Sequence, residues 1–346
     1  MDSDTGIRQA LEDKFEILSV IGRGGMATVY KAIQNSLNRV VALKVIHPNL
    51  VHDREFVDRF LREAQVCGQL NHPNIVTVYD FGSVGTVHYM SMEYLDGVTL
   101  RDKIKSNGIL DVKETISYIA PIAQALGYIH QRDIVHRDVK SSNIFITNEG
   151  RSVLMDFGIV FSKGKESLSQ YGVVLGTPEY MSPEQADGKT KVDGRSDIYS
   201  LGVIMFECLT DSLPFKSDNH LATLYQILHE DPPVVNSLNP HIPLWLTKIV
   251  TGCMTKERSL RISNGIRLAE ALNNKRFTDN LTIQYTEFAK EQTTRKVETT
   301  RIKSPTRIKI PIHISKNMEL QRPFLVAIFL TLLVILITLG VLVLSP

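Results

Sequence analysis

The sequence predicts an α+β protein made of a two-lobed globular body of about 320 residues and one C-terminal transmembrane helix. Near the N-terminus, β-forming residues alternate around a glycine cluster, and a segment with helical spacing follows. The chain ends in 21 uncharged apolar residues, Phe324 to Leu344. At about 1.5 Å rise per residue this run forms roughly 30 Å of helix, the thickness of a bilayer's hydrocarbon core.

The first predicted unit is the segment FEILSVIGRGGMATVYKAI, which reads as a strand, a tight turn and a second strand. Gly22, Gly24 and Gly25 would let backbone amides approach a phosphate without a Cβ in the way. Hairpins without a ligand also carry glycines, so the segment alone leaves both interpretations open. The next strand, VVALK, ends on Lys44, which is either an ordinary charged strand end or a charge directed at phosphate.

The following segment, HDREFVDRFLREAQVCGQL, has the spacing of a helix, and Asp53 is its expected N-cap. Glu63 lies at the edge of the apolar face. A carboxylate in that position needs a partner, and Lys44 is the natural candidate. The apolar face consists of Phe56, Phe60, Ala64 and Cys67.

The centre of the chain, HRDVKSSNIFITNEGRSVLMDFG, predicts a β-hairpin with strands IFI and VLM and a turn at NEG. Folding the hairpin midway between Glu149 and Gly150 places Asn143 opposite Asp156, about 5 Å apart. An amide oxygen and a carboxylate presented together suit Mg²⁺ that keeps water and phosphate ligands. Asp138 precedes Asn143 by five residues in a loop, where it could face a hydroxyl.

The segment from residue 276 to residue 322 carries ten Lys/Arg and five Asp/Glu, is rich in threonine and has no sustained apolar period. It reads as a flexible basic linker, acting as a solvated tether, as a contact for anionic lipid headgroups, or as both. The excess of positive charge beside residues 324–344 marks that side of the membrane as the inside. A buried core helix is the alternative for the apolar run, which its length and lack of charge disfavour.

Composition and the N-terminal sequence also bear on nucleic-acid binding, secretion and the redox compartment. The net charge of +2 gives no indication of nucleic-acid binding, and the polar, acidic N-terminus is no signal peptide. The three cysteines are odd in number and have no metal-type spacing, which suits a reducing compartment. They are Cys67, Cys208 and Cys253.

Residues 15–275 resemble the eukaryotic-like (Hanks-type) serine/threonine protein kinases, especially the membrane-anchored bacterial ones. The resemblance runs in order through the glycine loop, VALK, the helix glutamate, MEYLDG, HRDVKSSN, DFG, GTPEYMSPE, SDIYSLG and RSLRIS. It implies a bilobal fold with a β-rich N-lobe (residues 15–95) and a helical C-lobe (residues 96–275). It also implies ATP, Mg²⁺ or Mn²⁺, protein substrates, autophosphorylation and a possible homodimer.

The resemblance assigns roles residue by residue. Lys44 resembles the lysine that binds the α- and β-phosphates and pairs with Glu63, and Asp138 resembles the catalytic base. Asn143 and Asp156 match the metal ligands, and Lys140 with Thr177 resembles the pair typical of Ser/Thr kinases. Glu184 and Arg261 resemble a structural ion pair, and Asp197 resembles a residue that bonds to the catalytic loop. The expected ATP-binding residues are Ile21, Gly22, Arg23, Gly24, Gly25, Val29, Ala42, Lys44, Met92, Glu93, Leu95 and Phe145.

Two other functions share parts of this pattern. A pseudokinase scaffold would be favoured by loss of Lys44, Asp138, Asn143 or Asp156, and all four are present. A small-molecule kinase would lack the peptide-docking segment GTPEYMSPE, which is also present. We therefore interpret the chain as an active protein kinase whose catalytic lobes lie in the cytoplasm and are tethered by a single C-terminal membrane span. Arg137 needs an anion if it is buried, and a phosphate on Ser169, or second on Ser167, would supply it.

Overall fold

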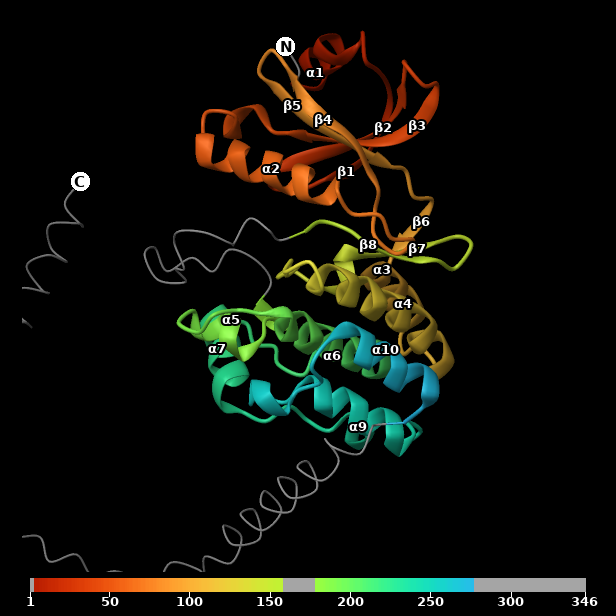
Figure 1. Ribbon diagram of the computed structural model, residues 1–346, viewed down its shortest axis with the longest axis vertical. Coiled ribbons are helices and arrows are strands. Elements are labelled where there is room, and N and C mark those ends of the chain that lie inside the picture. Colours follow the sequence, from red (N-terminus) through yellow and green to blue (C-terminus); the bar gives the residue numbers. More distant parts are fainter. Residues whose placement is uncertain (1–2, 158–177, 277–346) are drawn as a thin grey trace, which may run out of the picture. The chain divides into compact units, whose positions relative to one another are not determined.

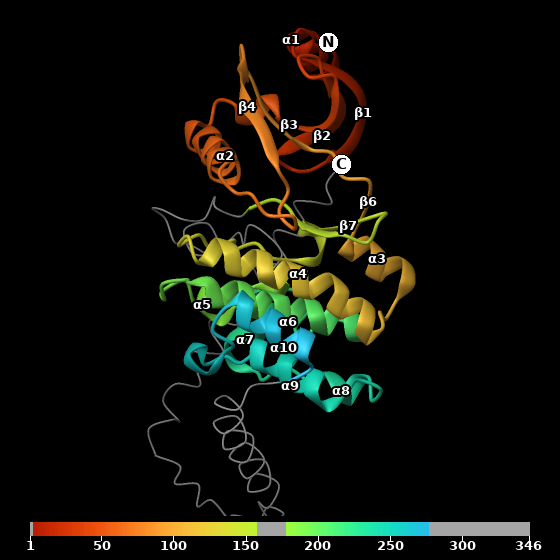
Figure 2. The same ribbon diagram turned by 45° about the vertical axis from the view of Figure 1, so that its right-hand side comes forward.

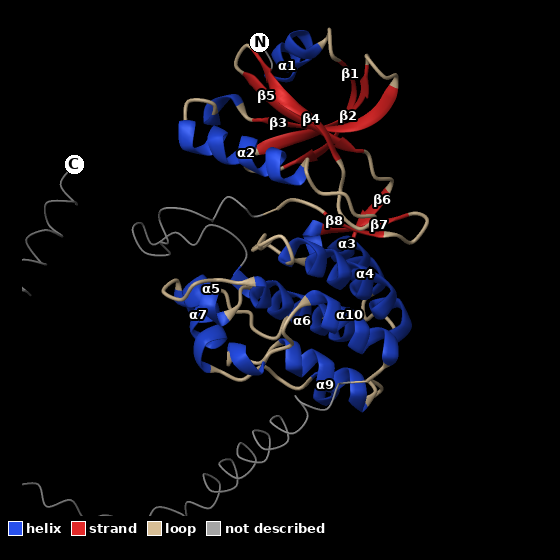
Figure 3. Ribbon diagram, viewed as in Figure 1, coloured by secondary structure: helices blue, strands red, loops and turns tan. Residues whose placement is uncertain are grey.

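The computed structural model describes residues 3–157 and 178–276, in which a β-rich lobe precedes a helical lobe (Figures 1 and 3). The N-lobe is built on one antiparallel sheet with strand order β1-β2-β3-β5-β4. The predicted α+β bilobal class is confirmed. The strands are β1 (Phe15–Arg23), β2 (Ala27–Gln34), β3 (Arg39–Ile46), β4 (Val78–Val84) and β5 (Val87–Glu93).

Two helices cover opposite faces of this sheet, because successive strand residues point to opposite sides. On β3, Val41, Leu43 and Val45 pack with helix α1 (Ser3–Leu11). The alternate residues Ala42 and Ile46 pack with helix α2 (Arg54–Cys67). Figure 2 shows α1 and α2 on different sides of the sheet.

Helix α2 begins where the sequence predicts. The Asp53 carboxylate accepts a hydrogen bond from the backbone N–H of Phe56, so the expected N-cap is confirmed. Of the predicted apolar face, Phe60, Ala64 and Cys67 are buried and Phe56 is partly buried, and Glu63 is buried beside them. Helix α1 was not expected from the polar N-terminal segment.

The C-lobe begins with a three-stranded sheet of order β6-β7-β8 and continues as helices around one apolar core. At its centre, helices α4 and α10 approach so closely that a Cβ on Gly265 would lie 2.0 Å from the carbonyl oxygen of Ala123. The strands are β6 (Gly97–Thr99), β7 (Ile144–Thr147) and β8 (Ser152–Leu154). The helices are α3 (Leu100–Asn107), α4 (Val112–His130), α5 (Pro183–Asp187), α6 (Gly194–Thr210), α7 (His220–His229), α8 (Val235–Leu238), α9 (Leu244–Cys253) and α10 (Gly265–Asn274).

Several predicted features involve residues that the structure does not describe. The predicted span 324–344 and all of the predicted linker after Arg276 lie outside the described residues, as does the segment with Ser167, Ser169 and Thr177. Among the described helices, none combines the length and apolar character needed to cross a membrane. The three cysteines are buried and form no disulfide.

Candidate active site

Lys44 connects the two lobes at the centre of the candidate site. It lies on β3, and its Nζ is 3.5 Å from Glu63 Oε1 on α2 and 2.8 Å from Asp156 Oδ1 in the C-lobe. The partner expected for Glu63 is thus present. Two carboxylates share one ammonium group, an arrangement in which incoming phosphate oxygens would compete for the same charge.

Burial and charge act against each other in this cluster. Burial raises the pKa of Glu63 to about 7, although the Lys44 charge opposes the rise. Burial alone would lower the pKa of Lys44, but Asp156 and Glu63 outweigh it and raise that pKa. The Lys44 charge in turn lowers the pKa of Asp156. Lys44 therefore stays protonated at neutral pH and supplies a permanent positive charge.

Residues 136–143, the predicted catalytic loop, place a compact polar group around Asp138. Lys140 Nζ lies 2.8 Å and 3.0 Å from the two carboxylate oxygens of Asp138. Asn143 Nδ2 donates to the backbone oxygen of Asp138 at 2.9 Å and to its Oδ2 at 3.0 Å. These contacts fix the carboxylate in one orientation, as a group that must align a substrate hydroxyl requires.

Asp197 on α6 binds the backbone of this loop. Its carboxylate accepts hydrogen bonds from the backbone N–H groups of His136 and Arg137 at 2.9 Å each, and its Oδ2 lies 2.8 Å from His130 Nε2. Arg137 (φ 68°) and Asp156 (φ 46°) both have left-handed backbones, which cost free energy for residues other than glycine. The bonds to Asp197 offset part of that cost at Arg137.

The predicted register of the β7–β8 hairpin was wrong by one residue. Ile144 pairs with Leu154 and Phe145 with Val153, so Asn143 stands opposite Met155 and not opposite Asp156. The backbone N–H of Met155 donates to the Asn143 oxygen at 2.8 Å. The turn has three residues, 148–150, with Gly150 at φ 84°, and an odd turn shifts the pairing by one. Asp156 is therefore one residue beyond the facing position.

Asn143 and Asp156 nevertheless suit a hard cation. The Asn143 amide nitrogen makes both hydrogen bonds to Asp138, which leaves its carbonyl oxygen as the end of the side chain for a ligand role. That oxygen and the Asp156 carboxylate are the oxygen donors that Mg²⁺ takes alongside phosphate and water. Within residues 3–157 and 178–276, no cluster of three or more His, Cys, Asp or Glu side chains is arranged to hold a metal.

An apolar wall adjoins the polar group. Val29, Ala42, Met92 and Leu95 belong to one cluster between the sheet and α2. Val153 is buried in the same cluster, and Phe145 faces Val153 across the β7–β8 ladder, on the same side of that small sheet. Four of the predicted adenine-binding residues thus share one apolar cluster, and Phe145 is paired with Val153 of that cluster.

Glu93 ends β5 beside this wall. Its backbone N–H donates to the Thr77 oxygen at 2.8 Å, and its carboxylate pairs with Arg151 of the C-lobe. Arg151 also donates to the Pro73 oxygen at 3.0 Å. This contact between the lobes was not expected from the sequence, since Arg151 is a single charged residue after a turn.

The glycine-rich turn connects β1 to β2. Ile21, Gly22 and Arg23 end β1, and the Gly24 N–H donates to the Ala27 oxygen at 2.9 Å. A Cβ placed on Gly25 would meet nothing within 4 Å, and one on Gly24 would meet only the Ala27 oxygen, at 3.6 Å. Neither glycine has a left-handed backbone. The packing of the described residues therefore does not require glycine at either position.

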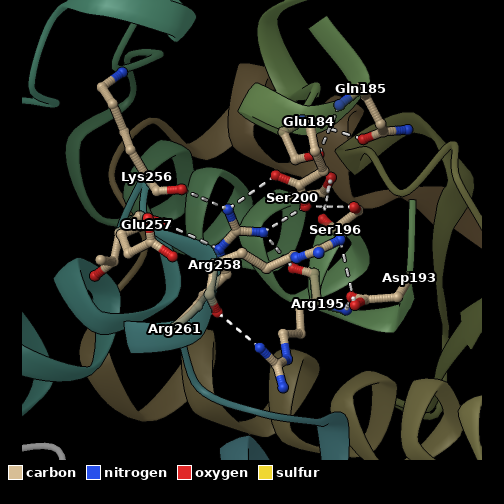
Figure 4. A network of polar contacts seen from close by, with 12 residues as sticks. Glu184, Gln185, Asp193, Arg195, Ser196, Ser200, Lys256, Glu257, Arg258 and Arg261 are labelled. Atoms are coloured by element: carbon tan, nitrogen blue, oxygen red, sulfur yellow. Dashed lines mark hydrogen bonds and ion pairs between the residues drawn. The ribbon is translucent and has the colours of Figure 1, made fainter. Parts of the chain in front are cut away.

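A buried ion pair anchors the segment that follows Thr177 (Figure 4). Arg261 Nη1 and Nη2 lie 2.7 Å and 3.0 Å from the two carboxylate oxygens of Glu184, and their side chains are 0% and 6% exposed. Ser196 Oγ also donates to Glu184 at 2.5 Å. Next to Glu184, Gln185 Nε2 donates to the Arg137 oxygen at 2.8 Å, so this anchor reaches the catalytic loop.

Comparison with known proteins agrees with this geometry. The family model of the protein kinase domain matches residues 15–278. The crystal structure of the Mycobacterium tuberculosis PknI kinase domain has a TM-score of 0.60 and 27% identity, covering 76% of this chain and 96% of that chain. The match therefore covers nearly all of the PknI kinase domain.

Curated relatives are bacterial. Serine/threonine-protein kinase PrkC of Bacillus subtilis is 37% identical over 281 residues, 79% of this chain and 43% of that protein. Serine/threonine-protein kinase PknB of Mycolicibacterium smegmatis is 45% identical over 230 residues, 65% of this chain and 37% of that protein. This chain therefore spans about two fifths of the length of these relatives. By its sequence, fold and polar site, the chain belongs to the protein kinase domain family.

Proposed function

We propose that the chain is an ATP-dependent protein serine/threonine kinase that transfers the γ-phosphoryl group to Ser and Thr hydroxyls of proteins, including its own. The observation that carries the proposal is the 2.8 Å contact of Lys44 with Asp156 across the lobes. It brings the phosphate-binding lysine and the metal-binding carboxylate into one site, beside Glu63. The names of the relatives in Bacillus and Mycolicibacterium support the same reaction class.

The residues act mainly through position and charge. Asp138 accepts a hydrogen bond from the substrate hydroxyl, directs its oxygen at the γ-phosphorus and takes its proton as the phosphate ester forms, while the bond from the γ-phosphorus to the bridging oxygen breaks and ADP leaves. Lys140, 2.8 Å from Asp138, would neutralise charge on the transferred group. Lys44 neutralises the α- and β-phosphates, and Glu63 orients Lys44.

The cofactors in this proposal are ATP and Mg²⁺, with Mn²⁺ as a substitute. Asn143 through its amide oxygen and Asp156 through its carboxylate would hold the cation, which when bound neutralises phosphate charge. The apolar wall with Val29, Ala42 and Met92 would contact the adenine ring. The glycines whose presence the packing does not explain would admit the phosphates.

The test is transfer of radiolabel from γ-labelled ATP to a generic basic protein in the presence of Mg²⁺ or Mn²⁺. We expect labelled phosphoserine or phosphothreonine in the substrate and in the kinase. Wild-type protein that binds ATP but transfers no label under either metal would instead establish a pseudokinase scaffold. Label on a small metabolite and none on protein would establish a small-molecule kinase.

We also propose that residues 324–344 anchor the kinase in the cell membrane by a single span, with the catalytic lobes in the cytoplasm. The support is the uncharged 21-residue run and the excess of basic residues between 276 and 322. That linker would contact anionic headgroups through its positive charge.

Deleting residues 323–346 should release a soluble kinase with an unchanged rate, because the span supplies location and not chemistry. The measurements are fractionation of the full-length and shortened proteins and their initial rates. A matched control keeps the span and replaces only Lys316 and Arg322 by Gln. Digestion of residues 15–275 by protease added outside intact cells would contradict the orientation.

Autophosphorylation of the segment between Phe157 and Pro178 completes the proposal, with Ser169 as the first choice and Ser167 as the second. A phosphoserine brings about −1.5 to −2 charges and three acceptor oxygens, enough to order a segment on Arg137. Mass spectrometry of the autophosphorylated protein should find phosphate there, and the Ser167→Ala/Ser169→Ala variant should be slower than wild type. Full activity of that variant with no phosphate in residues 160–172 would contradict the assignment.

A further inference from the structure

Helix α1 precedes the region matched by the kinase family model, yet it is built into the N-lobe. Ile7 and Leu11, one helical turn apart, are 5% and 0% exposed and pack with Phe15 and Tyr30 of the sheet. Arg8 Nη1 donates to the Ile17 oxygen at 2.5 Å, beside the first of two bulges in β1. Burial of these two apolar side chains holds the helix against the sheet.

The docked helix presents Asp4 to the glycine-rich end of β1. Asp4 Oδ2 lies 2.7 Å from Arg23 Nη2, and Asp4 Oδ1 accepts a hydrogen bond from the Tyr30 hydroxyl at 2.8 Å. Tyr30 is fully buried. One oxygen of the carboxylate is thus tied to a rigid part of the sheet, while the other holds a side chain of the glycine-rich segment.

Arg23 belongs to the glycine-rich segment that, in the proposed function, receives the phosphates of ATP. It lies between Gly22 and Gly24, is the last residue of β1, and pairs with Thr28 after the second bulge of that strand. The strand end carries two bulges, and the bond of the Gly24 N–H to the Ala27 oxygen closes the turn beyond it, so a side-chain contact at Arg23 adds to the restraints on this segment. On the other side of the turn, His47 donates its N–H to the Met26 oxygen at 3.1 Å and contacts Thr28 Oγ1 through Nε2 at 3.1 Å.

Asp4 itself stays away from the nucleotide. Tyr30 packs with α1 on one face of the sheet, whereas its neighbour Val29 packs with Ala42 and Met92 on the other. The contact of Asp4 with Tyr30 places the carboxylate on the face opposite the proposed adenine surface. Any influence on ATP must therefore pass through Arg23 and the strand that carries it.

We infer that Asp4 is a positioning residue for ATP, which holds Arg23 and thereby fixes the glycine-rich turn that receives the phosphates. The inference rests on the proposed kinase function and adds to it a determinant outside the matched domain. A restrained turn loses less conformational freedom when phosphates bind, so removing the restraint weakens ATP binding. The chemical step at Asp138 is untouched.

The test compares Asp4→Asn with wild type in the full chain. We expect the KM for ATP to rise about two- to fivefold, the range that an ion pair between partly exposed groups supports. The kcat and the KM for the protein substrate should stay within twofold of wild type. Asp4→Glu, which keeps the carboxylate, should restore most of the affinity, and Asp13→Asn, an exposed acid with the same change of charge, should behave as wild type.

A double-mutant comparison isolates the pair. In an Arg23→Gln background, Asp4→Asn should no longer change the KM for ATP, because its partner is gone. An unchanged KM in the Asp4→Asn single variant would overturn the inference. An equal rise with and without Arg23, or an equal rise in Asp13→Asn, would overturn it too.

A second readout separates this inference from the proposed function. Amide hydrogen exchange in residues 22–28 of the nucleotide-free protein should be faster in Asp4→Asn than in wild type and Asp13→Asn. This holds whether or not the chain transfers phosphate. Equal exchange in all three proteins would overturn the role of Asp4, whereas a wild type without kinase activity would overturn only the proposed function.

Discussion

Replacing Asp138 by Asn should lower the rate of phosphoryl transfer by about 10²–10⁴-fold, the range that a positioned general base contributes. The amide keeps the size of the side chain but offers one acceptor oxygen and cannot take the hydroxyl proton. Lys140 donates to both carboxylate oxygens and Asn143 donates to Oδ2, so an amide nitrogen in either position would lose at least one of these hydrogen bonds. The measurement is the initial rate of label transfer from ATP at saturating substrate.

The control for this variant is Asp133→Asn. Asp133 is an exposed acid in the same loop and has φ 58°, a backbone conformation that Asn adopts readily. Its rate should stay near wild type, and both variants should keep the wild-type melting temperature within a few degrees. An Asp138→Asn protein that retains more than a tenth of the wild-type rate would remove Asp138 from the role of base.

Local sequence patterns predicted those parts of the site whose backbone conformation depends on residues close to them in the chain. The turn at Gly24, the strand ending near Lys44 and the cap at Asp53 all follow from backbone preferences over a few positions. The pairing of Glu63 with Lys44 followed from a different argument, since a carboxylate on a buried face needs a cation.

The register of the β7–β8 hairpin was harder to predict than these local features, because it depends on whether the turn has two or three residues. The sequence TNEGR permits a two-residue turn at Glu149 and Gly150, and the predicted register depends on that turn. In the structure Gly150 occupies the left-handed third position of a longer turn. The change moves the facing pair from Asn143 and Asp156 to Asn143 and Met155.

Helix α1 was missed because its apolar content is small. Ile7 and Leu11 have the spacing of one helical turn, and that was the available signal in a segment otherwise polar. A nine-residue helix is marginal in water, so it forms here through packing against the sheet that follows it in the chain. The contacts of Asp4 with Arg23 and Tyr30 depend on that packing and could not be read from composition.

The largest expected effect on stability comes from the buried pair of Glu184 and Arg261. Replacing Arg261 by Ala should lower the free energy of unfolding by about 3–5 kcal/mol, the typical cost of leaving one buried charge without its partner. Besides Glu184, the guanidinium donates to the backbone oxygens of Thr255 and Arg195 at 3.0 Å and 2.9 Å. Urea denaturation of wild type and variant measures the difference.

The control is the more exposed pair of Arg258 and Asp193, 3.5 Å apart, in which the side chains are 33% and 45% exposed and Arg258 Nη1 also donates to the Lys191 backbone oxygen at 2.7 Å. Asp193→Asn would also alter the cap of α6, so Arg258→Gln is the better control. We expect it to cost about 0–1 kcal/mol, since solvent screens the pair. Arg261→Lys should fall between the two, because it keeps the charge but not the two-pronged geometry.

The pH dependence of the Glu184→Gln variant distinguishes an ion pair from simple packing. Burial would raise the pKa of Glu184, but the hydrogen bonds and charge of Arg261 outweigh it and lower that pKa below its usual value. The pair thus contributes its full stability above the unfolded pKa of about 4.5 and loses it as pH falls through the lower folded value. The stability difference between wild type and Glu184→Gln should therefore be constant near neutrality and shrink in acid. A stability difference that does not change down to pH 3 would mean that Glu184 acts through its shape alone.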